Sequence, residues 1–122
     1  MRLSTLSALF MLSAPAAAQE VPIQNTIRAQ IQAFQADDFA RAFTFASPNI
    51  HALFGSPEAF GKMVREGYPM VYRPADIAML DLRFIGGAYW QRVRVTDANG
   101  RAYWLDYQMI ETPEGWQING VQ

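Results

Sequence analysis

The chain has 122 residues, ten basic and eleven acidic side chains, and a formal net charge of −1. This length fits one domain, and the near-neutral charge argues against binding to nucleic acid or to an anionic membrane surface. The chain has no cysteine and one histidine, which excludes disulfides, thiolate catalysis and cysteine- or multi-histidine metal sites within one chain. Apolar residues make up 51% of the sequence, enough for a packed core.

The first 18 residues have the features of a secretory signal peptide. Arg2 supplies a positive charge, a mostly apolar segment follows over residues 3–12, and alanines at 16–18 match a small-residue cleavage site. A membrane anchor is the alternative, but the apolar segment is shorter than the roughly 20 residues of a span. We expect cleavage after Ala18, export to the periplasm of a two-membrane host, and no stable membrane anchor afterwards. Residues 19–122 then form a single domain.

Residues 22–67 are predicted to be helical. Pro22 suits a first helical turn. The apolar residues that follow it recur at spacings of four, four and three, and so define one helix face: Ile23, Ile27, Ile31 and Phe34.

Three further helix starts follow in the sequence. The aspartate pair at residues 37–38 interrupts the first pattern and can cap a second helix. Ser-Pro pairs at residues 47–48 and 56–57 each offer a serine cap followed by proline in the first turn. Gly55 and Gly67 are predicted to end the two helices that these pairs begin.

Residues 68–122 are predicted to be mainly strands. Residues 68–72 are assigned to a short edge strand, since proline within a sheet is tolerated there. From Asp76 onward the apolar period becomes two, which predicts strands at about 76–85, 88–96, 101–111 and 116–121.

The turns between these strands predict the register of the sheet. Gly86-Gly87 forms a two-residue hairpin loop, and residues 97–100 form a type I turn that ends in a left-handed glycine. This register places Leu80 opposite Val93 and Gln91 opposite Tyr107. One face of the sheet is then mainly apolar, and the sequence predicts an α+β protein with helices packed on that face of a curved antiparallel sheet.

The other face of the predicted sheet mixes charges with large apolar side chains. Asp81, Arg92 and Asp106 align across three strands in a favourable minus-plus-minus order. Aromatic and arginine side chains are enriched at interfaces, so a homodimer through this face is expected, or else a loop covers it. The interface candidates are Trp90, Trp104, Ile85, Ile110 and Arg92.

Several short segments resemble one bacterial family. These include IQAF at 31–34, DDFARAF at 37–43, FASP at 45–48, GYP at 67–69 and WQINGV at 116–121. Their order and spacing over residues 22–122 are similar to those of the bacterial domain of unknown function numbered 4864. The order of helices before the sheet also resembles the cystatin-like, cone-shaped superfamily of nuclear transport factor 2, SnoaL-like cyclases and ketosteroid isomerase. The resemblance implies a cone fold but assigns no catalytic residue, because the family has no established activity.

The apolar face predicts a ligand cavity between helices and sheet. Gln91 and Tyr107 are its buried polar pair, and either they bond one another or a trapped water, or they orient a small hydrophobic ligand. The predicted lining is Gln91, Tyr107, Tyr89, Tyr103, Trp116, Phe34, Phe43, Phe54 and Met63. The same side chains also suit a filled core.

The alternative is a cofactor-independent isomerase, cyclase or hydrolase. Its general base would be a carboxylate in the cavity, but the predicted inner face offers only Glu111 at its rim. A dyad of His51 with Asp81 or Asp106 is disfavoured, because both aspartates are predicted to point outward. Nothing in the sequence indicates a cofactor or a metal site. The favoured hypothesis is therefore non-enzymatic binding of a small hydrophobic ligand or a protein partner.

Overall fold

The computed structural model describes residues 15–122. The predicted signal peptide lies mostly outside the described residues, and cleavage after Ala18 stays a prediction. The elements follow one another as α2 (Pro15–Gln35), α3 (Phe39–Thr44), α4 (Pro48–Phe54), α5 (Pro57–Gly67), α6 (Pro69–Tyr72), β1 (Asp76–Ile85), β2 (Ala88–Thr96), β3 (Ala102–Thr112) and β4 (Gly115–Val121).

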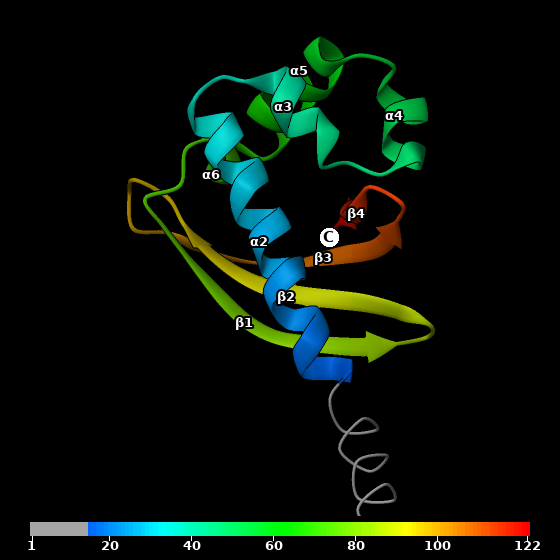
Figure 1. Ribbon diagram of the computed structural model, residues 1–122. Helices are drawn as coiled ribbons and strands as arrows, with labels where there is room; N and C mark the ends of the chain where they lie inside the picture. The colour runs from blue at the N-terminus through cyan, green and yellow to red at the C-terminus, as the bar shows by residue number, and fades with distance from the viewer. Residues whose placement is uncertain (1–14) are drawn as a thin grey trace, which may run out of the picture.

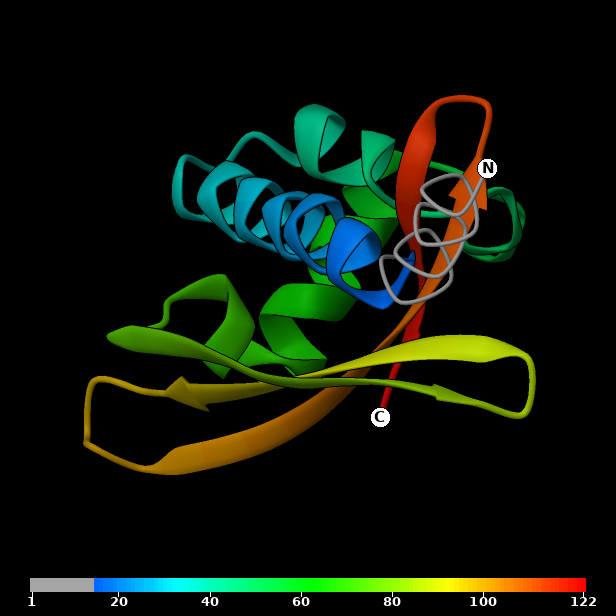
Figure 2. The same ribbon diagram turned by 60° about the horizontal axis from the view of Figure 1, so that its bottom comes forward.

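The helices form one layer on one face of a single antiparallel sheet. The strand order is β1-β2-β3-β4, so each strand pairs with its neighbour in sequence. Figure 1 shows α2 crossing in front of the sheet. In this view α3, α5 and α6 are gathered around the upper end of α2, and α4 lies on the side of β4. In Figure 2 the β3–β4 hairpin bends up beside the helices, which makes the sheet strongly curved. The predicted α+β class is confirmed.

Helix α2 buries the face that the sequence predicted. Ile23, Ile27, Ile31 and Phe34 are each at most 1% exposed. The predicted start at Pro22 is wrong, because the helix begins at Pro15 and Pro22 lies inside it. The alanines and polar residues between the two prolines are good helix formers, which explains the earlier start.

The predicted caps of the next three helices are confirmed. The Asp38 side chain accepts from the Arg41 N–H at 3.1 Å and begins α3. Ser47 and Ser56 cap α4 and α5 in the same way, each followed by proline in the first turn. Gly55 ends α4 with a φ of 80°, where a side chain would be strained.

The segment at residues 68–72 was predicted as an edge strand, and that prediction is wrong. Residues Pro69–Tyr72 form the short helix α6, and the N–H of Arg73 donates to the Pro69 carbonyl at 3.0 Å. Proline suits a first helical turn because its φ is fixed and its missing N–H is not needed there. This second role of proline decided the local structure.

The strand boundaries and most of the register are confirmed. Tyr89 pairs with Met109, Gln91 with Tyr107, and Met109 with Ile118. Gly100 has a φ of 82°, as the predicted turn requires. The inner face of β2 and β3 therefore points at the helices as expected.

The register of β1 differs from the prediction by one residue over its first half. Met79, not Leu80, pairs with Val93, because a bulge lies between Met79 and Leu82. Ile77 and Met79 consequently pack on the core in place of the predicted Ala78 and Leu80. A bulge adds a residue to one strand and reverses the faces beyond it.

The outer face keeps part of the predicted charge row. Arg92 and Asp106 form a two-bond ion pair at 2.9 and 3.0 Å across β2 and β3. Asp81 lies in the bulge and pairs instead with Arg83 on its own strand, at 2.6 Å. Both Asp81 and Asp106 point away from the helices, which excludes the dyad with His51.

Candidate functional site

A cavity of about 240 Å³ lies between the helices and the β3–β4 side of the sheet. Residues from α2, α4, α5, α6, β3 and β4 enclose it. Its lining consists of Gln30, Phe34, Ala46, Ile50, Leu53, Phe54, Phe60, Met63, Val64, Tyr68, Val71, Tyr107, Ile118, Gly120 and Val121. An apolar cavity of about 150 Å³ is enough to bind benzene, so this one has room for a small organic molecule.

The cavity has a buried end and an open end. Gln30 and Tyr107, which reach it from α2 and β3, are 4% and 1% exposed. At the other end Leu53 of α4 is 73% exposed, and Ile50 and Met63 are half-buried. The open end is therefore apolar, the two buried polar side chains are Gln30 and Tyr107, and the partly buried Tyr68 also lines the cavity.

Tyr107 lines this cavity from β3 and is almost fully buried. Within residues 15–122 the Tyr107 hydroxyl has no hydrogen-bond partner. It is not completely enclosed by protein atoms, however, since Gln117 Oε1 is the only fully buried side-chain polar atom of the described chain that lacks a partner. Since the Tyr107 side chain is otherwise enclosed, the cavity is the space that its hydroxyl borders. Burial raises the pKa of Tyr107 far above its ordinary value, so the group is a neutral hydrogen-bond donor.

Gln30 is the second polar group at the buried end. Its Nε2 donates to the Ala42 carbonyl at 3.1 Å, which assigns its other atom, Oε1, as an acceptor. Tyr68, nearer the end of β4, donates its hydroxyl to the Val121 carbonyl at 3.4 Å. The cavity thus offers a few neutral donors and acceptors within an apolar wall.

The lining of the cavity contains no charged side chain and no imidazole. A general base would need a carboxylate or histidine in contact with the bound molecule. Across residues 15–122 no group of three or more His, Cys, Asp or Glu side chains is placed to hold a metal ion.

The structure brings together four of the predicted lining residues. Tyr107, Phe34, Phe54 and Met63 all border the cavity. Gln30 and Tyr68 also line the cavity and were not among the predicted residues. Gln30 follows Ile27 by three residues and precedes Phe34 by four, so the helix period places it on the same buried face. Tyr68 was not predicted because residues 68–72 were predicted to form a strand.

The other predicted lining residues lie elsewhere. Gln91 does not bond to Tyr107, and its Nε2 donates to the carbonyls of Leu80 and Arg92 at 3.0 and 2.9 Å. Its polar end is therefore used to hold the β1 bulge.

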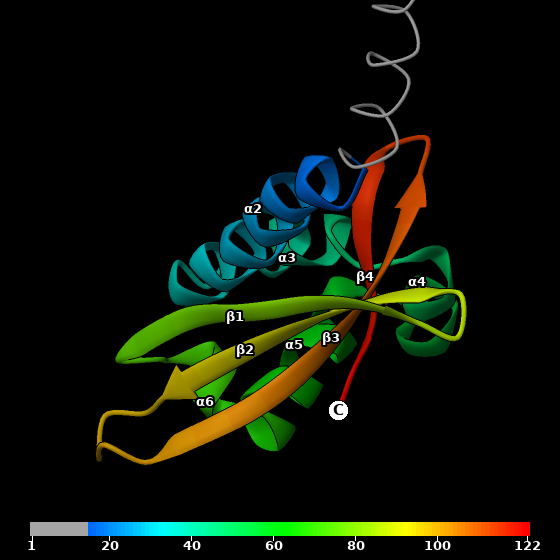
Figure 3. The ribbon, with the colours of Figure 1, turned by 90° about the horizontal axis from the view of Figure 1, so that it is seen from below.

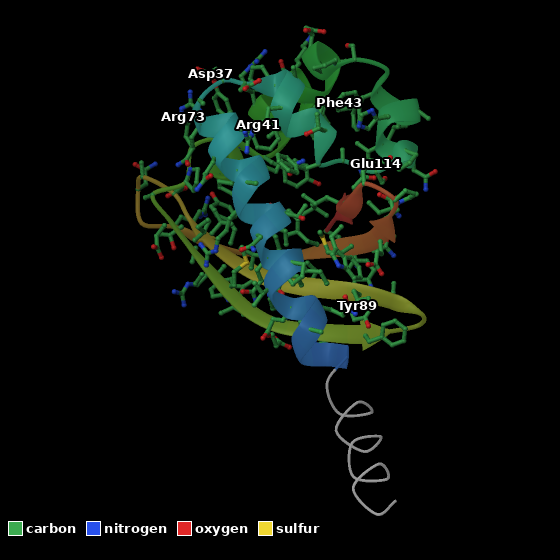
Figure 4. The ribbon with its side chains drawn as sticks, viewed as in Figure 1. Asp37, Arg41, Phe43, Arg73, Tyr89 and Glu114 are labelled. Carbon is green, nitrogen blue, oxygen red and sulfur yellow. The ribbon has the colours of Figure 1, made fainter. Side chains whose placement is uncertain are left out.

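Three aromatic candidates also lie outside the cavity. Tyr89 packs edge-on to Trp116, with ring centroids 5.4 Å apart, near the β1–β2 hairpin (Figure 4). Tyr103 donates its hydroxyl to Asp97 at 3.2 Å, in the turn before β3. The sequence correctly places these residues on the face of the sheet that is turned toward the helices. The cavity, however, borders only the β3–β4 part of that face.

His51 and Phe43 form a stacked pair beside the cavity and not in its lining. Their ring centroids are 3.8 Å apart, and His51 Nε2 lies 2.6 Å from the Phe43 carbonyl. A carbonyl oxygen only accepts, so Nε2 carries the proton and donates. The geometry gives His51 a structural role in joining α4 to α3.

The sequence matches one protein family over nearly its whole length. The family described as Domain of unknown function (DUF4864) matches residues 16–122. The chain belongs to this family. No curated protein matches the sequence. The chain is similar to an NTF2-like protein of unknown function from Burkholderia pseudomallei, known from a crystal structure, with 16% identity, 82% of this chain and 87% of that chain covered, and a TM-score of 0.38.

The outer sheet face holds the predicted interface residues. Figure 3 shows this face toward the viewer, with α5 and α6 behind the strands. Trp104 and Ile85 are 60% and 54% exposed, while Trp90 and Ile110 are partly buried. Arg92 lies among them in its ion pair with Asp106. None of the helices that the structure describes covers this face.

Within the described residues, no helix is long and apolar enough to cross a membrane.

Proposed function

We propose that this protein, after export, binds a small, mainly apolar molecule in the cavity between its helices and β3–β4. One observation carries the proposal: a cavity of about 240 Å³ has a mainly apolar lining that includes two buried polar side chains, Gln30 and Tyr107. Small-molecule sites usually combine an apolar wall with a few polar groups that orient the ligand. The sequence of residues 1–18 supports export.

A binding role is favoured over the enzymatic alternative. The lining provides phenols and an amide but no carboxylate or imidazole. Burial raises the pKa of Tyr107, so this phenol is a poor general base near neutral pH. The same groups are well suited to hydrogen-bonding an uncharged ligand.

An NMR titration tests the proposal on the protein itself. With methyl-13C methionine, Met63 reports on the cavity and Met79, on β1, reports on a region outside it. Titration with 1-octanol should shift the Met63 methyl signal in a saturable way and leave the Met79 signal in place. No saturable shift at Met63 with octanol or any shorter alcohol would contradict the proposal.

A matched pair of variants on α4 provides the control. Ile50→Trp places a large ring into the cavity lining, whereas Ala52→Trp adds the same ring on the exposed side of the same helix. We expect the first variant to abolish the Met63 response and the second to preserve it. Equal responses in both variants would place the octanol outside the cavity.

A second role, self-association through the outer sheet face, is supported by a separate observation. Trp104 and Ile85 remain more than half exposed on a face that also carries both Arg92 and Asp106. A patch with both charge signs is compatible with a second copy of itself across a two-fold axis. Sedimentation velocity should show a dimer that Trp104→Glu dissociates and Leu53→Glu, which changes an exposed leucine elsewhere, does not. A monomer at all concentrations would contradict this role.

A further inference from the structure

Most of the cavity wall is apolar, its two buried polar side chains are Gln30 and Tyr107, and its most exposed lining residue is Leu53. We propose that its ligand is an amphiphile with an uncharged hydroxyl head, bound head first, with the head at Tyr107 and Gln30 and the apolar tail directed toward Leu53. This inference rests on the proposed function and adds the ligand's chemical class and its orientation.

The head is uncharged because no residue in the lining could balance a charge. Transfer of an unpaired carboxylate or ammonium group from water into an apolar interior is strongly unfavourable. The other buried lining residues are apolar, and the two polar side chains of the buried lining, Tyr107 and Gln30, are a phenol and an amide at 1% and 4% exposure. Each of these can bond to a neutral group without the cost of burying a charge.

A hydroxyl matches the two polar groups better than a ketone or an ether. The Tyr107 hydroxyl is available to donate, and Gln30 Oε1 accepts because the amide nitrogen is already bonded to the Ala42 carbonyl. An alcohol both donates and accepts, whereas a ketone or an ether only accepts. An alcohol head therefore satisfies both residues.

The tail is directed outward because the mouth is apolar and exposed. Leu53 is 73% exposed on α4 and still belongs to the cavity lining. Ile50 and Met63 flank the same opening and are only half-buried. A tail that leaves the cavity over these side chains covers apolar surface that the described chain leaves open to water.

The class of ligand is tested by titrating 1-hexanol, 1-heptanol, 1-octanol and octanoate at pH 7.5, with the Met63 methyl signal as the readout. Affinity should rise about two- to fourfold per added methylene as the tail buries apolar surface. Octanoate should bind at least tenfold more weakly than 1-octanol. Equal affinity for octanoate and 1-octanol would overturn the uncharged head.

The orientation is tested by one variant at each end of the cavity. Tyr107→Phe should weaken all three alcohols by a similar factor of about five, and Tyr103→Phe, whose hydroxyl bonds to Asp97 instead, should weaken none. Leu53→Ser should weaken 1-octanol more than 1-hexanol, with Ala52→Ser as its neutral control on the same helix.

The outcomes separate this inference from the proposed function. If no alcohol binds to the unmodified protein, the proposed function itself fails. If alcohols bind but Tyr107→Phe has no effect, or Leu53→Ser weakens short and long alcohols equally, the cavity is a binding site and the proposed head-first orientation is wrong.

Discussion

Gln91 and Leu80 are joined by a hydrogen bond that crosses the irregular part of β1, in which the Gln91 Nε2 donates to the Leu80 carbonyl at 3.0 Å. The same nitrogen also donates to the Arg92 carbonyl at 2.9 Å, and the Gln91 side chain is fully buried. The bulge leaves Leu80 without a cross-strand partner in the β1–β2 ladder. Gln91 thus supplies a hydrogen bond that the ladder does not.

Replacement of Gln91 by methionine should destabilise the protein by about 1–3 kcal/mol. The side chain keeps nearly the same volume, but the partly buried carbonyls of Leu80 and Arg92 lose their donor. Gln32→Met, an equivalent change at an exposed position of α2, is the control and should alter stability by less than about 0.5 kcal/mol. Urea unfolding of both variants measures the difference. Equal midpoints would show that Gln91 does not support the bulge.

Gly61 is a position where α5 approaches α3 closely. A β-carbon at Gly61 would lie 2.6 Å from the Phe39 ring, whereas one at Gly67 on the same helix would meet nothing within 4 Å. Phe39 has little freedom to move, because its ring stacks on Tyr72 and lies under the Arg65 guanidinium.

Alanine at these two glycines should therefore have opposite effects. Gly61→Ala should lower stability by about 1–2 kcal/mol through overpacking, although alanine is the better helix former. Gly67→Ala should leave stability unchanged or raise it by a few tenths of a kcal/mol. Thermal unfolding of the two variants is the measurement, and a Gly61→Ala protein as stable as Gly67→Ala would contradict the close packing.

Asp37 links the end of α2 to α6. Its carboxylate accepts from the Tyr72 hydroxyl and pairs with Arg73 Nη2 at 3.0 Å, as Figure 4 shows for Asp37 and Arg73. The Tyr72 hydrogen bond, followed by the one from Arg73, lowers the pKa of Asp37 below its ordinary value. Asp37 also has a φ of 55°, a conformation that asparagine tolerates well.

The lowered pKa of Asp37 predicts a loss of stability in acid. The ionised carboxylate stabilises the fold above the unfolded pKa of about 3.9, and this contribution is lost as pH falls through the lower folded value. Asp37→Asn should lower the melting temperature at pH 6 and reduce its further fall between pH 4 and pH 2.5. Asp76→Asn, at an exposed aspartate, should keep the fall of the unmodified protein. If the melting temperature of Asp37→Asn fell between pH 4 and pH 2.5 as much as that of the unmodified protein, the stabilising role of Asp37 with Tyr72 and Arg73 would be contradicted.

The proposed export predicts a defined mature N-terminus. Expression of the full chain in a bacterium with a periplasm should yield a periplasmic protein that begins at Gln19, as read by mass spectrometry of the intact chain. Replacement of Ala16 and Ala18 by aspartate should block this processing, because the cleavage site needs small side chains. A periplasmic protein that keeps Met1 would instead support the membrane-anchor alternative.

Much of the fold was predictable because its signals are local. The spacing of Ile23, Ile27 and Ile31 follows the helix period, and the buried face of α2 follows from it directly. The turn at residues 97–100, which ends in a left-handed glycine, predicts the pairing of β2 with β3, because the turn geometry determines which residues face each other.

The parts that were not predictable depend on contacts distant in sequence. The β1 bulge has no signal of its own in residues 76–85, and it is held by Gln91 of the next strand. The cavity depended on whether Phe34 and Tyr107 meet across the core or leave space between them. That outcome depends on where α4, α5 and α6 lie relative to β3 and β4, and the sequence predicts a strand where the structure has α6.

A crystal structure with 6-bromo-1-hexanol soaked into the protein tests the central claim most directly. Anomalous scattering from bromine marks the end of the tail, and the hydroxyl marks the other end. The account predicts density inside the cavity, with the oxygen within hydrogen-bond distance of the Tyr107 hydroxyl and bromine near Leu53. Bromine density beside Tyr107 would show that the ligand binds in the opposite orientation. A cavity closed by its own side chains, with bromine bound only elsewhere, would contradict the binding function.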